Sequence, residues 1–317
     1  MSLRRLLDAI RNPAQLVVGA FVVLILIGTV LLRLPFSSDQ AGTVSVSDAL
    51  FMSTSASTVT GMATVDIAVF SLWGELVLLA LVQIGGFGIM TIGSVMAMVA
   101  SRRVGLRQRM LAQAEIGTVD MGELRVLIAA IVRITLAVEG AVALVLFLRF
   151  WQTDVADAGP AAYSAIFHSV VAFNNAGMSL YPDNLTRFVG DPVVNIAVSF
   201  AFIIGGLGFP ILVELVRRIR PRRWSLHTRI TLLATAVLLV LGPLLVVLFE
   251  WTNPGTLGPL ETGDKLLAGW FQGVSPRTAG FYTVSIGDMN EPTLLFITTL
   301  MFIGAGPAST SGGIKVT

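Results

Sequence analysis

The stretch Ala162–Gly177, AYSAIFHSVVAFNNAG, decides the fold. It holds a moderately apolar run of about three helical turns, followed by a turn of small residues that ends in glycine. A membrane span needs about 20 apolar residues, because a helix rises 1.5 Å per residue across a hydrocarbon core of roughly 30 Å. The run is too short to cross, so we expect a short helix that enters a membrane and returns through the glycine turn.

The same pattern occurs twice more, in Ser47–Gly61 (SDALFMSTSASTVTG) and in Asp264–Gly280 (DKLLAGWFQGVSPRTAG). An apolar segment with a glycine cluster follows each turn. These clusters begin at Gly85, Gly205 and Gly304, which lie 24, 28 and 24 residues beyond the glycine of the turn. Glycine is frequent in this chain, so one match would mean little. Three ordered repetitions indicate internal repeats of one structural unit.

Long apolar segments surround these stretches, and the composition agrees with a membrane protein. Charged residues make up 13% of the chain, whereas soluble globular proteins average about 25%. We expect six spans, at Asn12–Leu32, Leu76–Ser101, Val126–Leu148, Pro192–Val213, Ile230–Phe249 and Pro292–Ile314. The first has the basic start of a signal peptide, but Arg33-Leu34-Pro35 follows it where a small-residue cleavage site would stand. We therefore interpret it as a retained helix.

The basic residues predict the orientation of the spans. The N-terminal segment and the connections 102–125 and 217–229 hold 14 of the 21 Lys and Arg residues, while the alternate connections are richer in Asp and Glu. Basic connections stay on the cytoplasmic side. We expect a multi-pass protein of the cytoplasmic membrane with a cytoplasmic N-terminus. The basic run 217–229 also suits contact with anionic lipid or with a cytosolic regulator.

Several classes of function are disfavoured by what the chain lacks. Without cysteine there is no disulfide, thiolate metal site or cysteine nucleophile. Two histidines argue against a histidine-rich metal site, and a formal charge of +2 gives no reason to expect nucleic acid. An intramembrane hydrolase would need a Ser/His pair, paired Asp residues or a metal. No Asp lies centrally in an expected span and no HExxH motif occurs, so we do not expect an enzyme.

A glycine turn at membrane depth has a physical constraint. Its non-helical backbone must be buried in protein or line a water-filled path. Such a turn can direct backbone carbonyls at a dehydrating cation, and glycine supplies the positive φ that this requires. The short helix before it points its negative C-terminal end at the cation, and Asp48 and Asp264 suit the positive ends of two of these helices. The repeats thus predict a cation path.

The turns and the last glycine cluster resemble a known family. Thr58–Gly61, Asn174–Ser179 and Ser275–Phe281 are similar to the first three filter loops of the Trk/Ktr/HKT superfamily of K⁺ transporters, with the prokaryotic Ktr-type membrane subunit as the closest likeness. Gly304–Lys315 is similar to the loop that interrupts the second helix of that family's third repeat. The resemblance implies an all-α membrane fold of M1–pore helix–M2 units around a central pore.

The resemblance also implies the units and the site residues. Three units are expected at 1–110, 111–222 and 223–317, the last cut off within its M2 helix. The implied cation-binding filter residues are Thr58, Val59, Thr60, Gly61, Asn174, Asn175, Ala176, Gly177, Arg277, Thr278, Ala279 and Gly280. The implied gate residues are Gly304, Ala305, Gly306, Ser309, Thr310, Ser311, Gly312, Gly313 and Lys315.

The fourth unit of the family is missing from this sequence, which ends at Thr317. We expect a fragment, with completion by a second polypeptide as the alternative. The complete protein is expected to take up K⁺. A less selective Na⁺/K⁺ channel and a Na⁺- or H⁺-coupled symporter are the alternatives. The resemblance further implies a homodimer, a cytosolic ring of nucleotide-binding regulatory subunits, contact with membrane lipids and stimulation by Na⁺, with no cofactor.

Individual residues keep alternative interpretations. The side chains of Thr58, Thr60, Asn175 and Thr278 can add ligands or orient their turns, and we favour orientation. The clusters at Gly85 and Gly205 favour close helix packing over gating. Lys315 fits a plug in the pore about as well as a residue that extends its amine to the inner membrane interface. The intramembrane Glu139 and Arg133 fit structural partners on other helices about as well as an ion path. His168 is expected to serve packing.

Overall fold

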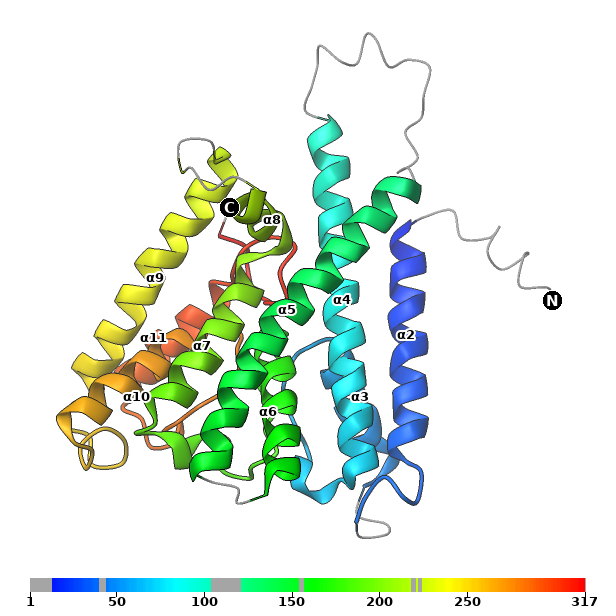
Figure 1. Cartoon of the computed structure of the whole chain (residues 1–317). Helices are drawn as coiled ribbons and strands as arrows, with labels where there is room; N and C mark the ends of the chain where they lie inside the picture. The colour runs from blue at the N-terminus through cyan, green and yellow to red at the C-terminus, as the bar shows by residue number, and fades with distance from the viewer. Residues whose placement is uncertain are drawn as a thin grey trace.

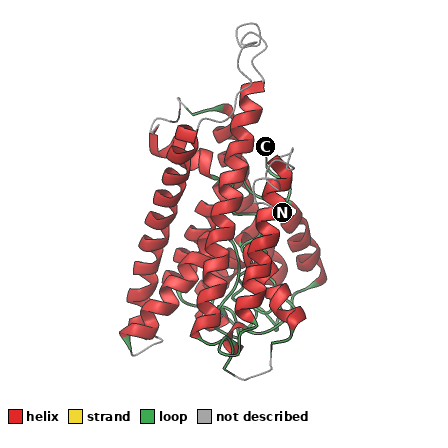
Figure 2. Ribbon diagram, turned by 90° about the vertical axis from the view of Figure 1, so that its right-hand side faces the viewer, coloured by secondary structure: helices red, strands yellow, loops and turns green. Residues whose placement is uncertain are grey.

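The computed structural model describes residues 13–39, 44–103, 121–153, 157–217, 221 and 224–316. In these ranges the regular elements are helices, with two isolated β-bridges, and the expected all-α fold is confirmed (Figure 2). The α-helices are α2 (Pro13–Leu32), α3 (Val46–Ser57), α4 (Leu72–Arg103), α5 (Met121–Thr153), α6 (Ala158–Phe173), α7 (Pro192–Leu207), α8 (Phe209–Arg217), α9 (Leu226–Glu250), α10 (Thr262–Val274) and α11 (Glu291–Phe302). Two 3₁₀ turns, η1 (Ile67–Val69) and η2 (Thr186–Phe188), lie in connections.

The helices form three groups with the same order: long helix, short helix, second apolar helix. The short helices α3, α6 and α10 each pack against the long helix that precedes them, and α3 and α6 also against the helix that follows. Figure 1 shows α2 and α4 running upright and α5 running obliquely, with α3 and α6 confined to the lower half. The expected unit boundaries at 110/111 and 222/223 lie outside the described residues.

Three described helices are long and apolar enough to cross a membrane, at Leu72–Val95, Arg125–Thr153 and Leu226–Glu250. The pair α7–α8 forms a fourth such segment if it is counted as one bent span. The first expected span corresponds to α2, whose described apolar part begins at Val17. The last expected span is helical to Phe302 and then continues as a loop, in agreement with its high content of Gly, Pro, Ser and Thr.

The expected span Pro192–Val213 corresponds to α7 and α8 and is sharply bent. The axes of α7 and α8 differ by 101° at a break of one residue, Gly208, whose φ is +93°. A positive φ is readily adopted by glycine and ends a right-handed helix. Pro210 has no N–H, so it could not donate to the carbonyl of Gly206 in a continuous helix. The local sequence therefore removes one helical hydrogen bond and permits a sharp bend.

The two acidic residues expected at the starts of short helices are found there. Asp48 is the third residue of α3, and its carboxylate closes a capping box with Ser45. Hydrogen bonds from the Ser45 side chain and backbone lower the pKa of Asp48. Asp264 lies in the first turn of α10. Negative charge in the first turn of a helix is stabilised by the free N–H groups and the helix dipole.

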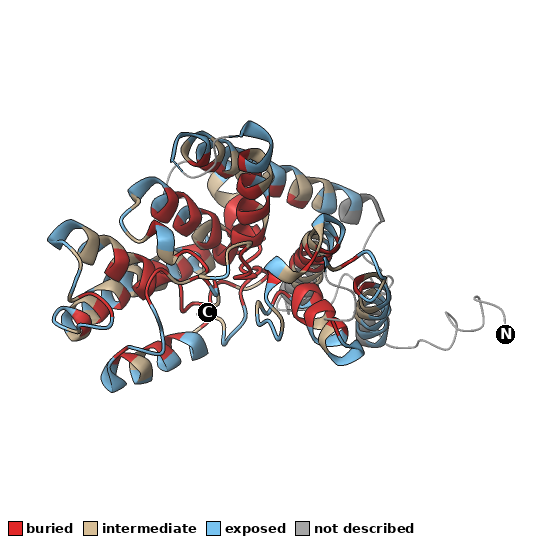
Figure 3. Ribbon diagram, turned by 90° about the horizontal axis from the view of Figure 1, so that it is seen from below, coloured by how far each residue is buried: buried red, intermediate tan, exposed pale blue. Residues whose placement is uncertain are grey.

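The buried core lies between the groups, whereas the outer faces are apolar and exposed. Buried residues lie on the sides of the helices that face one another, and exposed residues lie on the outer sides (Figure 3). Phe167, Phe173 and Val171 of α6 are fully buried there. On the outside, Leu26 of α2 and Leu244 of α9 are each more than half exposed. An apolar outer surface around a partly polar interior is the pattern expected in lipid.

Candidate functional site

The three turns after α3, α6 and α10 share one backbone conformation. The glycine that ends each turn has a positive φ: +83° at Gly61, +60° at Gly177 and +79° at Gly280. The residue two places earlier also has a positive φ, although it is Val59, Asn175 or Thr278. A positive φ is rare for non-glycine residues, above all for a β-branched one. Such backbone strain persists where the surroundings hold it in place, and it concentrates at functional sites.

The three turns meet backbone to backbone. A Cβ atom added to Gly61 would lie 2.1 Å from the carbonyl oxygen of Ala176 in the second turn. One added to Gly177 would lie 2.5 Å from the Cα of Gly280 in the third turn. Side chains cannot be accommodated at these points, so glycine is required by space as well as by φ. The three glycines that end the predicted turns thus lie close together in the structure.

The turn glycines line a polar cavity. Its volume is about 390 Å³, and Gly61, Gly177 and Gly280 all contribute to its wall. The other lining residues include Thr64, Asp66, Ser179, Tyr181, Asn184 and Tyr282. In the part of the chain that the structure describes, the carbonyls of Thr60, Ala176 and Ala279, one residue before each glycine, accept no hydrogen bond. Unpaired carbonyls at membrane depth are costly unless they meet water or a cation.

The side chains of the turns are engaged in hydrogen bonds within the protein. The Thr58 hydroxyl donates to the carbonyl of Thr54 (2.8 Å) and contacts the Thr60 hydroxyl. The Asn175 amide donates to the Thr310 hydroxyl (2.8 Å). The Thr278 hydroxyl accepts from the amide of Gly312 (3.1 Å). These contacts favour the orienting interpretation of the side chains, because backbone carbonyls are the unpaired groups.

The residues from Gly304 to Lys315, here called the 304–315 loop, lie against the second and third turns. The Thr310 hydroxyl donates to the carbonyl of Phe173 at the end of α6 (3.1 Å). The Ser311 hydroxyl donates to the carbonyl of Arg277, and the Lys315 amine donates to the carbonyl of Ser311. The loop also contacts the break between α7 and α8, where the amide of Gly306 donates to the carbonyl of Gly206 (2.9 Å).

The first two glycine clusters contact the ends of the short helices. A Cβ atom on Gly85 would lie 2.0 Å from the Ser57 carbonyl oxygen, and one on Gly205 would lie 1.9 Å from that of Phe173. Both oxygens belong to the last residue of a short helix. These equivalent contacts bear out the packing interpretation for Gly85 and Gly205. The break at Gly208 is a further role of the second cluster that the packing interpretation did not include.

The intramembrane charged residues do not pair with each other. Arg133 is exposed on α5, whereas Glu139 is buried. The carboxylate of Glu139 accepts from the side-chain amides of Gln83 on α4 and Asn174 after α6, each at 3.2 Å. No role was predicted for Gln83 from the sequence, although a glutamine within an apolar segment is a signal of a buried polar contact. His168 is fully buried and stacks on Tyr181, which confirms its packing role.

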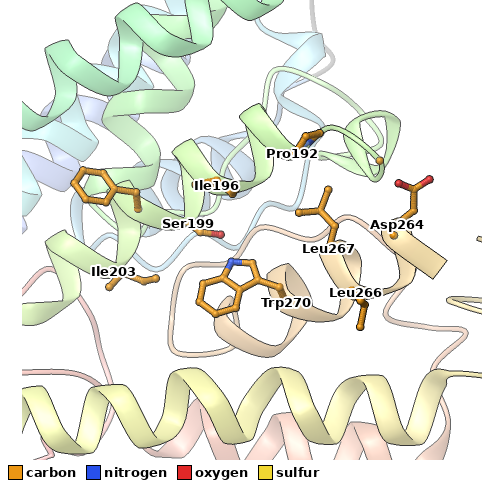
Figure 4. A pocket seen from close by; sticks show the side chains of 11 residues that line it. Pro192, Ile196, Ser199, Ile203, Asp264, Leu266, Leu267 and Trp270 are labelled. Carbon is orange, nitrogen blue, oxygen red and sulfur yellow. The ribbon is translucent and has the colours of Figure 1, made fainter. Parts of the chain in front are cut away.

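A second cavity, of about 770 Å³, lies between α7 and α10. Figure 4 shows Ile196, Leu267 and Trp270 around it, with Asp264 at one end. None of the turn glycines lines it, and Ile196 and Leu266 are more than half exposed. Apart from Asp264 and Ser199 its lining is apolar, so the candidate site is the polar cavity at the turns.

The fold and these turns define a multi-pass helical membrane protein whose short helices end in converging glycine turns. The chain belongs to the TrkH family of cation transport proteins, because the family model described as "Cation transport protein" matches residues 3–317. Members of this family are transport proteins and not enzymes. The expected membership of the superfamily is confirmed.

Curated relatives point to the Ktr branch. The chain is 42% identical over 312 residues to the Ktr system potassium uptake protein B of Bacillus subtilis, covering 96% of this chain and 68% of the relative. The protein of the same name from Vibrio alginolyticus is 40% identical, with 95% and 66% covered. The potassium/sodium uptake protein NtpJ of Enterococcus hirae is 33% identical, with 96% and 67% covered. The chain thus spans about two thirds of the length of these relatives.

A solved structure shows the same fold. The potassium transporter TrkH from Vibrio parahaemolyticus superposes with a TM-score of 0.69 at 23% sequence identity. The match covers 94% of this chain and 58% of that one. The described helices of this chain therefore form the greater part of a TrkH-type fold.

Proposed function

We propose that the complete protein takes up K⁺ across the cytoplasmic membrane, and that the three turns supply part of its selectivity filter. One observation carries this proposal: three glycine turns meet backbone to backbone at one polar cavity, each with an unpaired carbonyl next to its glycine. Relatives that are 42% and 40% identical are named potassium uptake proteins. Unpaired backbone carbonyls are the ligands that K⁺ needs in a filter.

The filter would act by replacing water around the ion. Carbonyl oxygens held at fixed positions substitute for the hydration shell of K⁺. The negative C-terminal ends of α3, α6 and α10 stabilise a cation at the same place. The proposed ligands are backbone oxygens of the segments Thr58–Gly61, Asn174–Gly177 and Arg277–Gly280. Their side chains keep the turns in position, because those of Thr58, Asn175 and Thr278 are already bonded within the protein.

The 304–315 loop is proposed as the gate. It lies against two of the turns and is joined to them by hydrogen bonds from Thr310 and Gly312. Its small residues and non-helical backbone allow it to move without breaking a helix. The Lys315 amine donates to the carbonyl of Ser311 (2.5 Å), so the charged group of Lys315 is bonded within the loop.

Topology and partners follow from the resemblance and the basic segments. We propose a cytoplasmic N-terminus, a homodimer, and a cytosolic ring of nucleotide-binding subunits that acts on the membrane subunit, with Na⁺ as an activator. Two relatives are named as proteins of a Ktr system, which fits a protein that works with further components. Lipids would cover the exposed apolar faces of α2 and α9.

A second candidate is a less selective path for Na⁺ and K⁺, or symport coupled to Na⁺ or H⁺. The relative from Enterococcus hirae is named a potassium/sodium uptake protein. One glycine in each turn also makes a short filter, with fewer ion positions in series than a longer one would offer.

Flux through the complete protein in proteoliposomes tests both candidates. We expect K⁺ flux to exceed Na⁺ flux at least tenfold, and G177S to abolish that preference because its Cβ would collide with Gly280. G159S is the matched control, since nothing lies within 4 Å of a Cβ at Gly159. Equal K⁺ and Na⁺ flux in the unmodified protein would contradict the K⁺ assignment. An unchanged preference in G177S would contradict the filter.

A further inference from the structure

One buried carboxylate joins two repeats beside the second turn. Glu139 of α5 is 5% exposed and lies inside the apolar span Arg125–Thr153. One of its oxygens accepts from Gln83 of α4, and the other accepts from Asn174, the residue that ends α6 and begins the second turn. The carboxylate therefore contacts the first repeat, the second repeat and the turn at once.

The three side chains form a closed ring of hydrogen bonds. Besides its bond to Glu139, the Asn174 amide nitrogen donates to the Gln83 carbonyl oxygen (3.0 Å) and to the backbone carbonyl of Val170 (2.9 Å). The backbone of Glu139 also holds α6, because the Ser169 hydroxyl donates to its carbonyl (2.6 Å). The side chain and the main chain of one residue thus fix the last turn of α6.

A need for close packing does not explain a carboxylate within the apolar span. Burying an acid in an apolar segment is costly unless it is well hydrogen-bonded, and ionisable residues in spans are rare outside functional sites. An apolar residue on α5 would fill the same space at lower cost. What Glu139 adds is two acceptors placed opposite two amide donors, which an apolar side chain cannot provide.

Two consecutive asparagines hold the second turn from opposite sides. Asn174 is bonded to Glu139 and Gln83, while Asn175, with φ +57°, is bonded to Thr310 of the 304–315 loop. The unpaired carbonyl of Ala176 follows directly. The position of this carbonyl relative to Gly61 and Gly280 depends on both anchors, because only backbone atoms of Ala176 and Gly177 meet the other two turns.

We propose that Glu139 is a positioning residue for ion selectivity: its carboxylate holds Asn174, and thereby sets the place of the carbonyls of the second turn. This inference rests on the proposed function of the turns as a filter. Small displacements of carbonyl oxygens change the balance between replacing the water of K⁺ and that of Na⁺. Loss of the anchor should therefore alter selectivity before it abolishes flux.

The ring makes a sharp prediction for a neutral substitution of the same shape. In E139Q the ring would consist of three amides: those of Gln83, Asn174 and the introduced glutamine. If the introduced amide and that of Gln83 both turn their oxygens toward the Asn174 nitrogen, their own nitrogens face each other, and one donor is left without an acceptor. Exchanging the two residues in Q83E/E139Q restores a carboxylate that accepts from both neighbours. The exchange leaves the composition and volume of the ring unchanged.

The test measures K⁺ and Na⁺ flux of the complete protein in proteoliposomes, together with the midpoint of thermal unfolding. We expect E139Q to lower the K⁺ over Na⁺ preference about tenfold, because one buried donor of the ring loses its acceptor, and Q83E/E139Q to recover most of it. R133Q on the exposed face of the same helix is the control and should keep the preference of the unmodified protein.

The outcomes separate this inference from the proposed function. If the unmodified protein shows no preference for K⁺, the filter proposal fails. If it shows one and E139Q retains it, the positioning role fails while the filter stands. Recovery in the exchange variant supports the ring; a loss in E139Q that the exchange does not recover overturns it. If E139Q does not fold, E139D takes its place, because it keeps the charge while shortening the reach to Asn174, and an unchanged preference there overturns the inference.

Discussion

The backbone amide of Phe209 donates to the carbonyl of Ala308, 3.1 Å away, across the break between α7 and α8. In a continuous helix the same amide would donate to the carbonyl of Gly205, which instead accepts from the amide of Thr310 (3.3 Å). The break and the 304–315 loop thus satisfy each other's backbone groups. Because unsatisfied groups are costly in a membrane, a displacement of the loop must be accompanied by a change at the break.

The first prediction concerns Gly208, the residue at the break. In G208A an L-residue would take φ +93°, and its Cβ would lie 2.3 Å from the carbonyl oxygen of Pro307. We expect a loss of about 2–3 kcal/mol in stability from strain and overpacking, and a higher basal K⁺ flux because the loop is pushed from its place. The midpoint of thermal unfolding and flux in proteoliposomes measure these effects.

Gly140 provides the control for G208A. It lies within α5 and has nothing within 4 Å of an added Cβ. G140A should leave flux unchanged and keep or raise stability by up to about 1 kcal/mol, since alanine favours a helix. The coupling of break and loop would be contradicted by a G208A protein that is less stable yet has the flux of the unmodified protein.

The second prediction concerns the contact between a glycine cluster and the end of a short helix. In G85A the added Cβ would lie 2.0 Å from the Ser57 carbonyl oxygen. We expect destabilisation by about 1–3 kcal/mol and a shift of the first turn that lowers K⁺ preference. G88A in the same cluster is the control, because its Cβ would meet Phe21 at 3.4 Å, an ordinary contact. Equal stability of the two variants would count against close packing at Gly85.

The repeated turns could be predicted from the sequence because their signals are local. A short apolar run followed by a glycine that needs a positive φ lies within about 16 residues, and three copies reinforce one another. The convergence of Gly61, Gly177 and Gly280 was implied by the resemblance to a family whose repeats surround one pore. In the structure Gly177 lies against Gly280, and Gly61 lies against the carbonyl of Ala176, in agreement with that expectation.

The bend at Gly208 and the partners of Glu139 depend on residues far along the chain. An apolar run such as Pro192–Val213 reports its length and hydropathy but not its continuity. Its break is stabilised by Gly306, Ala308 and Thr310, about 100 residues later. Glu139 meets Gln83 across 56 residues. No periodicity or local motif records such contacts, so the sequence alone leaves alternatives open for this acid.

The third prediction tests the bond between the second turn and the 304–315 loop. T310V keeps the shape of the side chain but removes the acceptor of Asn175 and the donor to the Phe173 carbonyl. We expect a loss of about 1–3 kcal/mol in stability, because buried polar groups lose their partner, and a higher basal K⁺ flux. T298V is the control: Thr298 is exposed on α11 and donates only within its own helix, to the carbonyl of Leu294. A T310V protein with the flux and stability of T298V would refute the role of this bond.

The last prediction uses pH and the connection that borders the polar cavity. Arg187 donates to both carboxylate oxygens of Asp183 and lies over the ring of Tyr181, which lines the cavity. These hydrogen bonds from Arg187 lower the pKa of Asp183. A carboxylate whose folded-state pKa is lowered stabilises the protein above its unfolded-state pKa of about 3.9, and this contribution is lost as the pH falls through the lower folded-state value.

We therefore expect D183N to be less stable than the unmodified protein near neutral pH, by less than about 1 kcal/mol, because the ion pair is more than one third exposed and screened by solvent. The difference should shrink as the pH is lowered below about 4. Unfolding midpoints measured at several pH values check this. D157N is the matched control, because Asp157 precedes α6 without a side-chain cap hydrogen bond and should show no such loss. If the gap between D183N and the unmodified protein stayed constant down to the lowest pH, the ion pair would not be its source.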